Sequence, residues 1–433
     1  MKKRSIVLFW CVLVLCVILG SSIVLGKTTI SLWGGFPETV PFFEKVAKDY
    51  QESHPDVELE ILASDLRDFE LKLSITIPSN TAGDILQIHP GFLYKYIEAG
   101  LIPPNPPDID AVLKKEGSYL QAAITTLTSK NETFGIPLFV GTRPVMFWNK
   151  KMFAEAGLSS APTNWDEVIS YSQKLARYDE KGNLIRSGIS LRLSGAGSGV
   201  AQKWAFWLYS AGGTIIEEYP DGKYRANYNN EAGKEALKLY IDLLYKYHVD
   251  SPEIKHDSEA FALGLTAMFT RESWVVGYMR QYAPQIEYDT ALLPSYKRAG
   301  TLDNVQNFYV TKSCKNPEIA WDFIKFMLQP EYQQYLFETV GWLPARVDVD
   351  YSSALEKSPQ YQNFIIFPES YGFYYESTIA CFDEIQTLLA ERLANAFLDQ
   401  TLLDNPEGIA KVIHEAAEET NNILKENKLY HED

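Results

Sequence analysis

Apolar and polar residues alternate at the start of the chain and then change to helical spacing. Ile30 and Leu32 alternate with polar neighbours, as in a strand that buries one face. After the glycines at 34 and 35, apolar residues recur at helical spacing, namely Phe42, Phe43, Val46, Ala47 and Tyr50. A second alternating stretch covers residues 57–61. Strand, helix and strand in this order predict a βαβ unit and a parallel sheet.

The same reading predicts further elements. A third strand fits residues 84–88, and the helix after it ends at Gly100, before a proline-rich connection at 103–107. Short extended segments are predicted over 132–139 and 144–148. Helices are predicted over residues 151–156, 165–176, 202–210, 230–247, 317–328, 331–340 and 384–398. Ligands of open α/β sheets bind beyond the carboxyl ends of the strands. The loops at 33–38 and 87–92 are therefore candidate site loops.

The first 26 residues predict export. Met1-Lys2-Lys3-Arg4 precedes an uncharged stretch that ends in Gly26, directly before Lys27. A basic start, an apolar run and a small residue at the exit are typical of a secretory signal peptide. The alternative is a retained membrane anchor, because the uncharged stretch approaches the length that crosses a bilayer. We expect a periplasmic or extracellular protein in either case.

Length, charge and cysteine content limit the classes of protein. The chain has 433 residues and a formal net charge of −16 at pH 7, so we expect two lobes and no nucleic-acid partner. Outside the signal only Cys314 and Cys381 remain, either as a disulfide or, as the simpler expectation, as two buried thiols. Aromatic residues make up 13%, including 26 Tyr and 9 Trp, which suits stacking on hydroxyl-rich ligands.

The motifs of common catalytic and cofactor sites are missing from the sequence. It contains no His-Glu-x-x-His, no Gly-x-Ser-x-Gly and no P-loop, and its six His are scattered. We therefore expect no enzyme activity, no metal and no cofactor. The segment Gly195-Ala196-Gly197-Ser198-Gly199 is similar to a dinucleotide fingerprint, but Val200 stands where the third glycine belongs. We interpret it as a site loop or a plain connection. A secreted carbohydrate-active enzyme with paired carboxylates stays the alternative from another class.

Short motifs in a fixed order resemble the bacterial extracellular solute-binding proteins of the maltose-binding type, which serve ABC importers. The most specific stretch comprises Phe-Gly-Ile-Pro at 134–137, Trp-Asn-Lys at 148–150, Phe153 with Glu-Ala-Gly-Leu at 155–158, and residues 162–167. Further motifs lie at residues 30–33, 50–55, 83–85, 99–101, 264–274, 293–294, 320–323 and 341–346. Two positions depart from the family. Asn304-Val305 replaces a frequent Gly-Gly, and Gly83 replaces a frequent Pro. The first departure lies near the expected site.

The resemblance implies a fold and a function. The fold is α/β, a two-lobed periplasmic-binding-protein fold (type II) whose hinge-connected lobes close around a ligand in the cleft between them. Lobe 1 would comprise residues 27–140 plus 303–345, and lobe 2 residues 141–302 plus 346–433. The expected ligand is a carbohydrate, the expected partners are ABC transporter permease subunits, and the protein is expected to be a monomer. A sugar phosphate, a glycerophospho-compound or a cyclic polyol is the alternative ligand. An anionic ligand would require Arg143, Arg192 and Arg271 to converge in the cleft.

The candidate ligand-binding residues combine aromatic rings with polar groups. They are Trp33, Phe36, Glu38, Gln87, His89, Thr142, Arg143, Trp148, Trp204, Trp274, Asn307, Trp342 and Tyr371. Rings cover the apolar face of a sugar, and polar side chains pair with hydroxyls that would otherwise be buried without a partner. Some have structural alternatives. Trp204 shares a helix face with apolar neighbours, Arg143 could be a solvated charge, and Glu38 could simply favour the start of the next helix.

Overall fold

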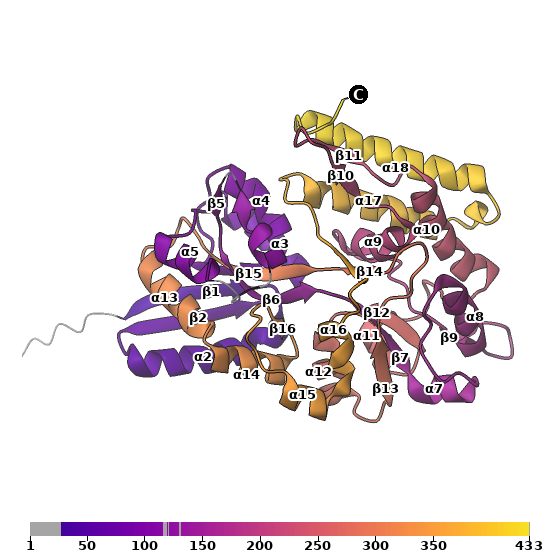
Figure 1. Cartoon of the computed structure of the whole chain (residues 1–433), viewed down its shortest axis with the longest axis horizontal. Helices are drawn as coiled ribbons and strands as arrows, with labels where there is room; N and C mark the ends of the chain where they lie inside the picture. Colours follow the sequence, from indigo (N-terminus) through magenta and orange to yellow (C-terminus); the bar gives the residue numbers. More distant parts are fainter. Residues whose placement is uncertain (1–26, 116–118, 120, 130, 433) are drawn as a thin grey trace, which may run out of the picture.

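A computed structural model of the chain describes residues 27–432, except 116–118, 120 and 130. The predicted signal segment lies outside these residues. Two α/β lobes lie side by side, with the N-terminal strands in one and the C-terminal helix in the other (Figure 1). Within the described ranges, no helix combines the length and the apolar character needed to cross a bilayer.

The first lobe is built on a six-stranded mixed sheet. Its strands follow the order β16 (Leu343–Pro344), β6 (Ile136–Thr142), β15 (Asn304–Val310), β3 (Ile85–Ile88), β1 (Thr28–Gly34) and β2 (Val57–Ala63). β1 pairs in parallel with both β2 and β3, which confirms the predicted βαβ unit. β15 comes from much later in the chain and runs antiparallel to β3 and β6. The parallel strands therefore end at one edge, where their loops face the other lobe.

Helices cover both faces of this sheet. In Figure 1, α3 (Leu66–Thr76) and α4 (Pro90–Glu98) lie above it, whereas α2 (Val40–Ser53) and α14 (Pro330–Val340) lie below. α2 packs against α13 (Pro317–Met327) as well as α14, and its apolar stripe is fully buried. The helical spacing predicted for residues 42–50 thus forms one side of the core of the first lobe.

The second lobe combines a small sheet with a helical core. The sheet has the order β12 (Met268–Arg271), β7 (Val145–Asn149) and β13 (Tyr288–Ala291), and both pairings are antiparallel. The helices α9 (Gly199–Ala211), α10 (Glu231–Ile241), α17 (Phe382–Phe397) and α18 (Pro406–Glu426) pack on one another. Trp204 lies at the centre of their core with none of its surface exposed.

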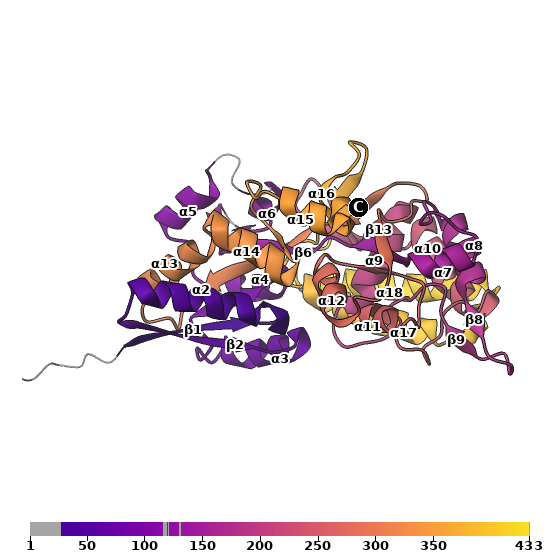
Figure 2. The same ribbon diagram turned by 90° about the horizontal axis from the view of Figure 1, so that it is seen from below.

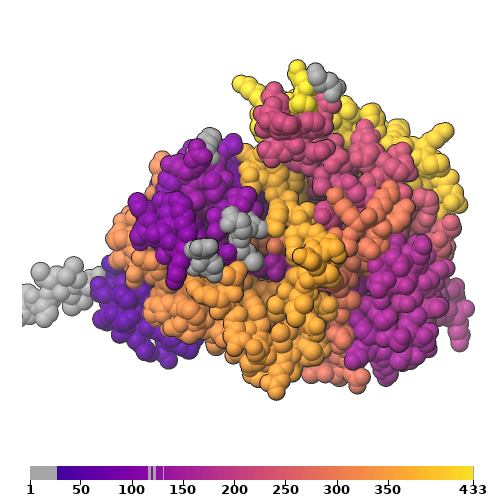
Figure 3. Space-filling view, in the orientation of Figure 1, coloured from indigo at the N-terminus to yellow at the C-terminus, as the bar shows by residue number. Residues whose placement is uncertain are grey.

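The chain crosses between the lobes more than once. β6 leads into β7, and β14 (Gly300–Leu302) leads into β15. β14 pairs in parallel with β17 (Gly372–Tyr374) of the returning segment. A Cβ atom on Gly300 would lie 2.5 Å from the carbonyl oxygen of Gly372, so this close approach of two crossings needs glycine. The returning helices α15 (Ser352–Lys357) and α16 (Gln362–Ile365) lie over the junction of the lobes (Figures 1 and 2). Figure 3 shows this returning segment, in orange, on the face between the lobes.

Three details differ from the expectation or extend it. The helix predicted over 230–247 ends at Ile241 and continues as a wider π-helical turn over residues 242–246. The long helix α18 was not predicted, although its N-cap Asn405 accepts a hydrogen bond from the backbone N–H of Gly408. Its buried residues also keep helical spacing, namely Ile409, Ile413, Ala416, Ala417, Thr420, Ile423 and Leu424. Cys314 is half-buried and Cys381 is buried, and both are free thiols.

Candidate functional site

A cavity of about 1240 Å³ lies between the two lobes, and we call it the cleft. Its first wall is formed by the loops after β1 and β3, by the start of α3 and by the end of β6. Its second wall is formed by the start of α9, the end of β12 and the helix α12 (Trp274–Tyr282). The loops after β1 and β3 lie where strand topology predicts ligand contacts.

An aromatic cluster lines part of the cleft. The ring of Trp342 stacks on Phe139 at 4.8 Å and meets the edge of Phe36 at 5.6 Å. Trp274 lies 6.4 Å from Trp342, and the Arg271 guanidinium lies 5.3 Å from the centre of the Trp274 ring. Trp342 is only 2% exposed, so a ligand meets chiefly Trp274 and Phe36. These rings offer flat apolar surface of the kind that covers one face of a sugar.

Glu38 lies beside this cluster as a partly desolvated carboxyl group. Its Oε1 accepts a hydrogen bond from the indole N–H of Trp342 at 3.2 Å. Burial raises the pKa of Glu38, while the hydrogen bonds that it accepts and the charge of Arg271 oppose this rise. Glu38 thus presents a strong acceptor to the cleft on the loop that follows β1.

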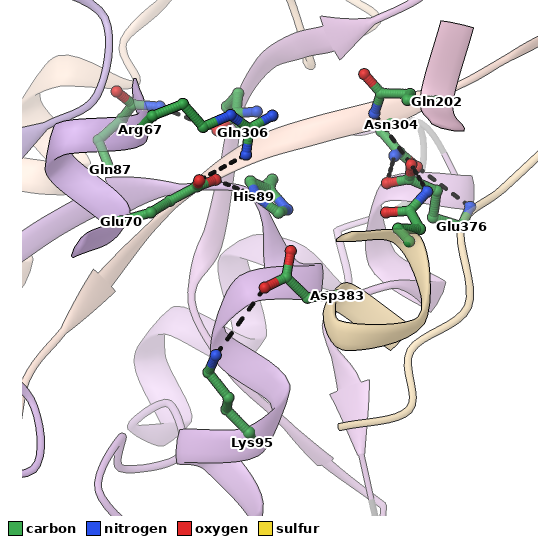
Figure 4. A network of polar contacts seen from close by, with 11 residues as sticks. Arg67, Glu70, Gln87, His89, Lys95, Gln202, Asn304, Gln306, Glu376 and Asp383 are labelled. Carbon is green, nitrogen blue, oxygen red and sulfur yellow. Dashed lines mark hydrogen bonds and ion pairs between the residues drawn. The ribbon is translucent and has the colours of Figure 1, made fainter. Parts of the chain in front are cut away.

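A second cluster is polar and joins the two lobes (Figure 4). Glu376, just after β17, accepts hydrogen bonds from Gln202 of α9 at 3.0 Å, from Gln386 of α17 at 2.7 Å and from Asn304 of β15. All four residues line the cleft. The side-chain amides keep further donors and acceptors that can pair with ligand hydroxyls.

His89 forms a third polar group with Glu70 and Arg67. Its Nε2 lies 3.2 Å from Oε1 of Glu70, which also pairs with Arg67 (Figure 4). Burial alone would lower the pKa of His89, but the hydrogen bond and the charge of Glu70 outweigh it and raise the pKa. Across the lobes, Lys95 of α4 lies 4.0 Å from Asp383 of α17. His89 therefore lies near an ionic contact between the two lobes.

The second wall carries a buried ion-pair network. Lys203 of α9 contacts Glu272 at 2.5 Å, and Arg271 pairs with both Glu272 and Asp257. Burial lowers the pKa of Lys203 to about 8, although Glu272 opposes this shift. Charges buried in this way need partners, so the network holds the wall in one arrangement.

The structure brings part of the predicted set together. Phe36, Glu38, His89, Thr142, Trp274 and Trp342 all line the cleft. Gln87 lies directly behind it and donates a hydrogen bond to Gln306, which lines it. Asn307 is fully buried on the opposite side of β15, where it donates to the hydroxyl of Tyr309.

The other predicted residues do not line the cleft. Trp33 packs under Lys72 of α3, against Gly83. Trp148 packs on Phe153, and Trp204 is core, so both belong to the interior of the second lobe. Arg143 forms a forked ion pair with Asp303. Tyr371 stacks on Phe367 and accepts a hydrogen bond from the backbone N–H of Leu293.

Several cleft residues were not among the sequence candidates. They include Arg67, Ser198, Gly199, Gln202, Asn304, Gln306, Glu376 and Gln386. Two features of the sequence could have identified some of these cleft residues. The segment 195–199 begins a helix with small residues, and Ser198 and Gly199 in it do line the cleft. Asn304, the departure from the family pattern noted in the sequence, also lines it. Nothing local marks Glu376 or Gln386.

Comparisons with known proteins identify relatives of this chain. The family model described as bacterial extracellular solute-binding protein matches residues 45–363. The chain belongs to the bacterial extracellular solute-binding proteins. This binding protein is 22% identical over 349 residues to the maltotriose-binding protein of Pyrococcus abyssi, an alignment that covers 78% of this chain and 71% of that protein.

Solved structures share its two-lobed fold. A solute-binding protein of an ABC transporter from Thermotoga lettingae, bound with α-D-tagatose, superposes with a TM-score of 0.78 at 22% identity, covering 92% of this chain and 100% of that one. A substrate-binding protein from Listeria monocytogenes in complex with cycloalternan gives 0.76 at 16% identity, with 92% and 99% covered. These matches confirm the two-lobed α/β fold predicted from the sequence.

Proposed function

We propose that this binding protein captures an oligosaccharide in the cleft and delivers it to the permease subunits of an ABC importer. The observation that carries the proposal is the composition of the cleft wall, where Trp274 and Phe36 line the same cavity as Glu376 and the side-chain amides that it binds. Rings and hydrogen-bonding groups on facing walls are what a hydroxyl-rich, partly apolar ligand requires. Relatives described as binding maltotriose, tagatose and cycloalternan support the same class.

The proposal includes how the protein works. The lobes at residues 27–140 plus 303–345 and at 141–302 plus 346–433 close around the ligand by bending at the crossings. The protein acts outside the cytoplasmic membrane as a monomer, after export with loss of about 26 residues. It binds without a cofactor and releases its ligand unchanged.

A ligand screen with two tryptophan variants tests this function. We expect at least one oligosaccharide to raise the melting temperature, because ligands that bind the native state stabilise it. Trp274→Ala should weaken that binding by about 1–3 kcal/mol, measured by calorimetry, through loss of apolar contact. Trp148→Ala is the matched control, since Trp148 packs in the second lobe away from the cleft. It should lower the melting temperature and leave the affinity unchanged.

Two results would contradict the proposal. If no mono-, di- or oligosaccharide raises the melting temperature, the proposal of a carbohydrate ligand is wrong. Steady formation of a cleaved product, detected by chromatography of the incubated sugar, would favour the carbohydrate-active enzyme instead.

A further inference from the structure

Two arginines pack on the glycine-rich segment 195–199 of the cleft, and a third arginine lies near them. Arg67 stands at the start of α3 in the first lobe, Arg192 precedes the segment, and Arg271 ends β12. A Cβ atom on Gly197 would lie 2.7 Å from Nη1 of Arg67. A Cβ atom on Gly199 would lie 2.8 Å from Cζ of Arg192. Both guanidinium groups therefore pack directly against this segment, and glycine is what permits their approach.

The three arginines differ in their partners. Arg67 pairs with Glu70 at 2.5 Å, and Arg271 pairs with Asp257 at 2.7 Å and with Glu272 at 3.1 Å. Among the residues that the structure describes, the guanidinium of Arg192 makes no hydrogen bond and no ion pair. It is half-buried and lines both the cleft and an adjoining cavity of about 240 Å³. Its five N–H donors are thus available to a ligand.

The charges around Arg192 are unbalanced. Four cations, Arg67, Arg192, Lys203 and Arg271, face three carboxylates, Glu70, Asp257 and Glu272. Burial lowers the pKa of Arg192, and the neighbouring charges of Arg271 and Arg67 lower it further, against Asp257 and Glu272.

The remaining cleft carboxylates do not supply the missing partner. Glu38 and Glu376 accept hydrogen bonds from other side chains, and Asp65 and Asp68 are exposed to solvent. A half-buried cation held near two like charges is costly without an anion beside it.

We propose that Arg192 binds an anionic group of the solute, a carboxylate or a phosphate ester, so that the ligand is an acidic sugar. This inference rests on the proposed carbohydrate function and specifies its ligand class. A guanidinium presents paired N–H donors in a plane, which matches the two oxygens of a carboxylate or phosphate. The start of α9 at Ser198 and Gly199 lines the same part of the cleft, and its positive end favours the same charge.

The arginines that the sequence analysis required for an anionic ligand converge only in part. The three arginines required to converge were Arg143, Arg192 and Arg271. The last two line the cleft, whereas Arg143 is bound to Asp303 at the junction of the lobes. Arg67 from the first lobe takes the third place. The anion-binding group is thus assembled from both walls of the cleft.

Calorimetric titration with a matched set of sugars tests the inference. The set contains a neutral oligosaccharide, an oligosaccharide of uronic acids and a hexose phosphate, which separate carboxylate from phosphate as the source of the charge. We expect one acidic sugar to bind at least about tenfold more tightly than the neutral sugar, the scale of a charge-assisted hydrogen bond. Arg192→Gln should remove that preference, and Arg192→Lys should restore part of it, because the charge returns without the planar fork.

Arg177→Gln is the control, since this arginine lies in the β8–β9 hairpin, outside the cleft. It should leave the preference for the acidic sugar intact. Thermal melts of each variant report whether it is folded. Equal or weaker binding of both acidic sugars compared with the neutral one would overturn the inference and leave the proposed function standing. If none of the sugars binds, the proposed function itself fails.

Discussion

Asp250 is a buried carboxyl group that the binding site does not use. Its Oδ2 accepts a hydrogen bond from the backbone N–H of Leu191 at 2.8 Å, and its Oδ1 has no partner among the described residues. Burial raises its pKa from 3.8 to about 8, although the backbone N–H groups of Leu191 and Ser251 oppose this. The folded state therefore holds a proton that the unfolded chain releases as the pH rises through this range.

This makes Asp250 a source of pH-dependent stability. Because the folded-state pKa is raised, its effect favours folding at low pH and is lost as the pH rises from about 4 to about 8. Asp250→Asn keeps an oxygen for Leu191 and cannot ionise. We expect the variant to gain stability over the natural protein as the pH increases, by about 1–3 kcal/mol at the upper end. Thermal melts across this range measure the gap, with the exposed Asp56→Asn as control. Parallel pH profiles for Asp250→Asn and the natural protein would contradict the assignment.

At the scale of elements, Arg143 connects the segments that cross between the lobes. It follows β6 in the first crossing, and its guanidinium donates to both carboxylate oxygens of Asp303, next to β15, at 3.0 and 2.9 Å. A third bond, of 3.2 Å, reaches the carbonyl oxygen of Phe364 in the returning segment. One side chain thus joins three crossings, so its role is in the hinge rather than in ligand contact.

The prediction at this scale concerns stability. Arg143→Gln leaves Asp303 as an unpaired buried charge and should lower the free energy of unfolding by about 3–5 kcal/mol, measured in denaturant. The double variant with Asp303→Asn should recover part of this loss, because no charge is then stranded. Lys45→Gln removes an exposed pair with Asp49 and serves as control, with an expected cost below about 1 kcal/mol. A loss for Arg143→Gln as small as the control would rule out the hinge role.

At the scale of the whole molecule, the two lobes already touch at points around the cleft. Arg67 of the first lobe packs on Gly197 of the second, and Lys95 lies 4.0 Å from Asp383. Gly197 has φ +65, a left-handed conformation that Asn also adopts readily. Asn at this position therefore strains the backbone less than most other residues would, and its Cβ atom would lie 2.7 Å from Nη1 of Arg67.

Gly197→Asn should therefore hold the lobes apart. We expect it to weaken ligand binding by about 1–3 kcal/mol, the cost of an added side chain in a packed contact. Small-angle X-ray scattering should show a larger radius of gyration for the liganded variant than for the liganded natural protein. Gly182→Asn is the matched control, because Gly182 also has a positive φ, of +84, but no described residue has an atom within 4 Å of its Cβ position. Identical scattering and affinity for both variants would show that this contact does not limit closure.

The sequence by itself determined features that depend on near neighbours. Alternation at Ile30 and Leu32 and helical spacing over 42–50 specify a strand and a helix, because each period buries one face. Asn164 accepts a hydrogen bond from the backbone N–H of Glu167 and starts its helix, as a short polar side chain does at that position. The loops after β1 and β3 were identified as site loops for a topological reason, and Phe36, Glu38 and His89 on them do line the cleft.

Tertiary structure alone decided which side chains on an element face the cleft. Asn304 and Gln306 line it, whereas Asn307, the sequence candidate on the same strand, points to the opposite face. Successive side chains of a strand alternate in direction, so a shift of one position exchanges cleft for core. The pairing of β15 with β3 and β6 decides which of its side chains face the cleft, and those strands lie more than a hundred residues earlier in the chain. The burial of Trp204 depends in the same way on distant segments, namely the helices that surround α9. Contacts between distant segments set these directions, and no local pattern encodes them.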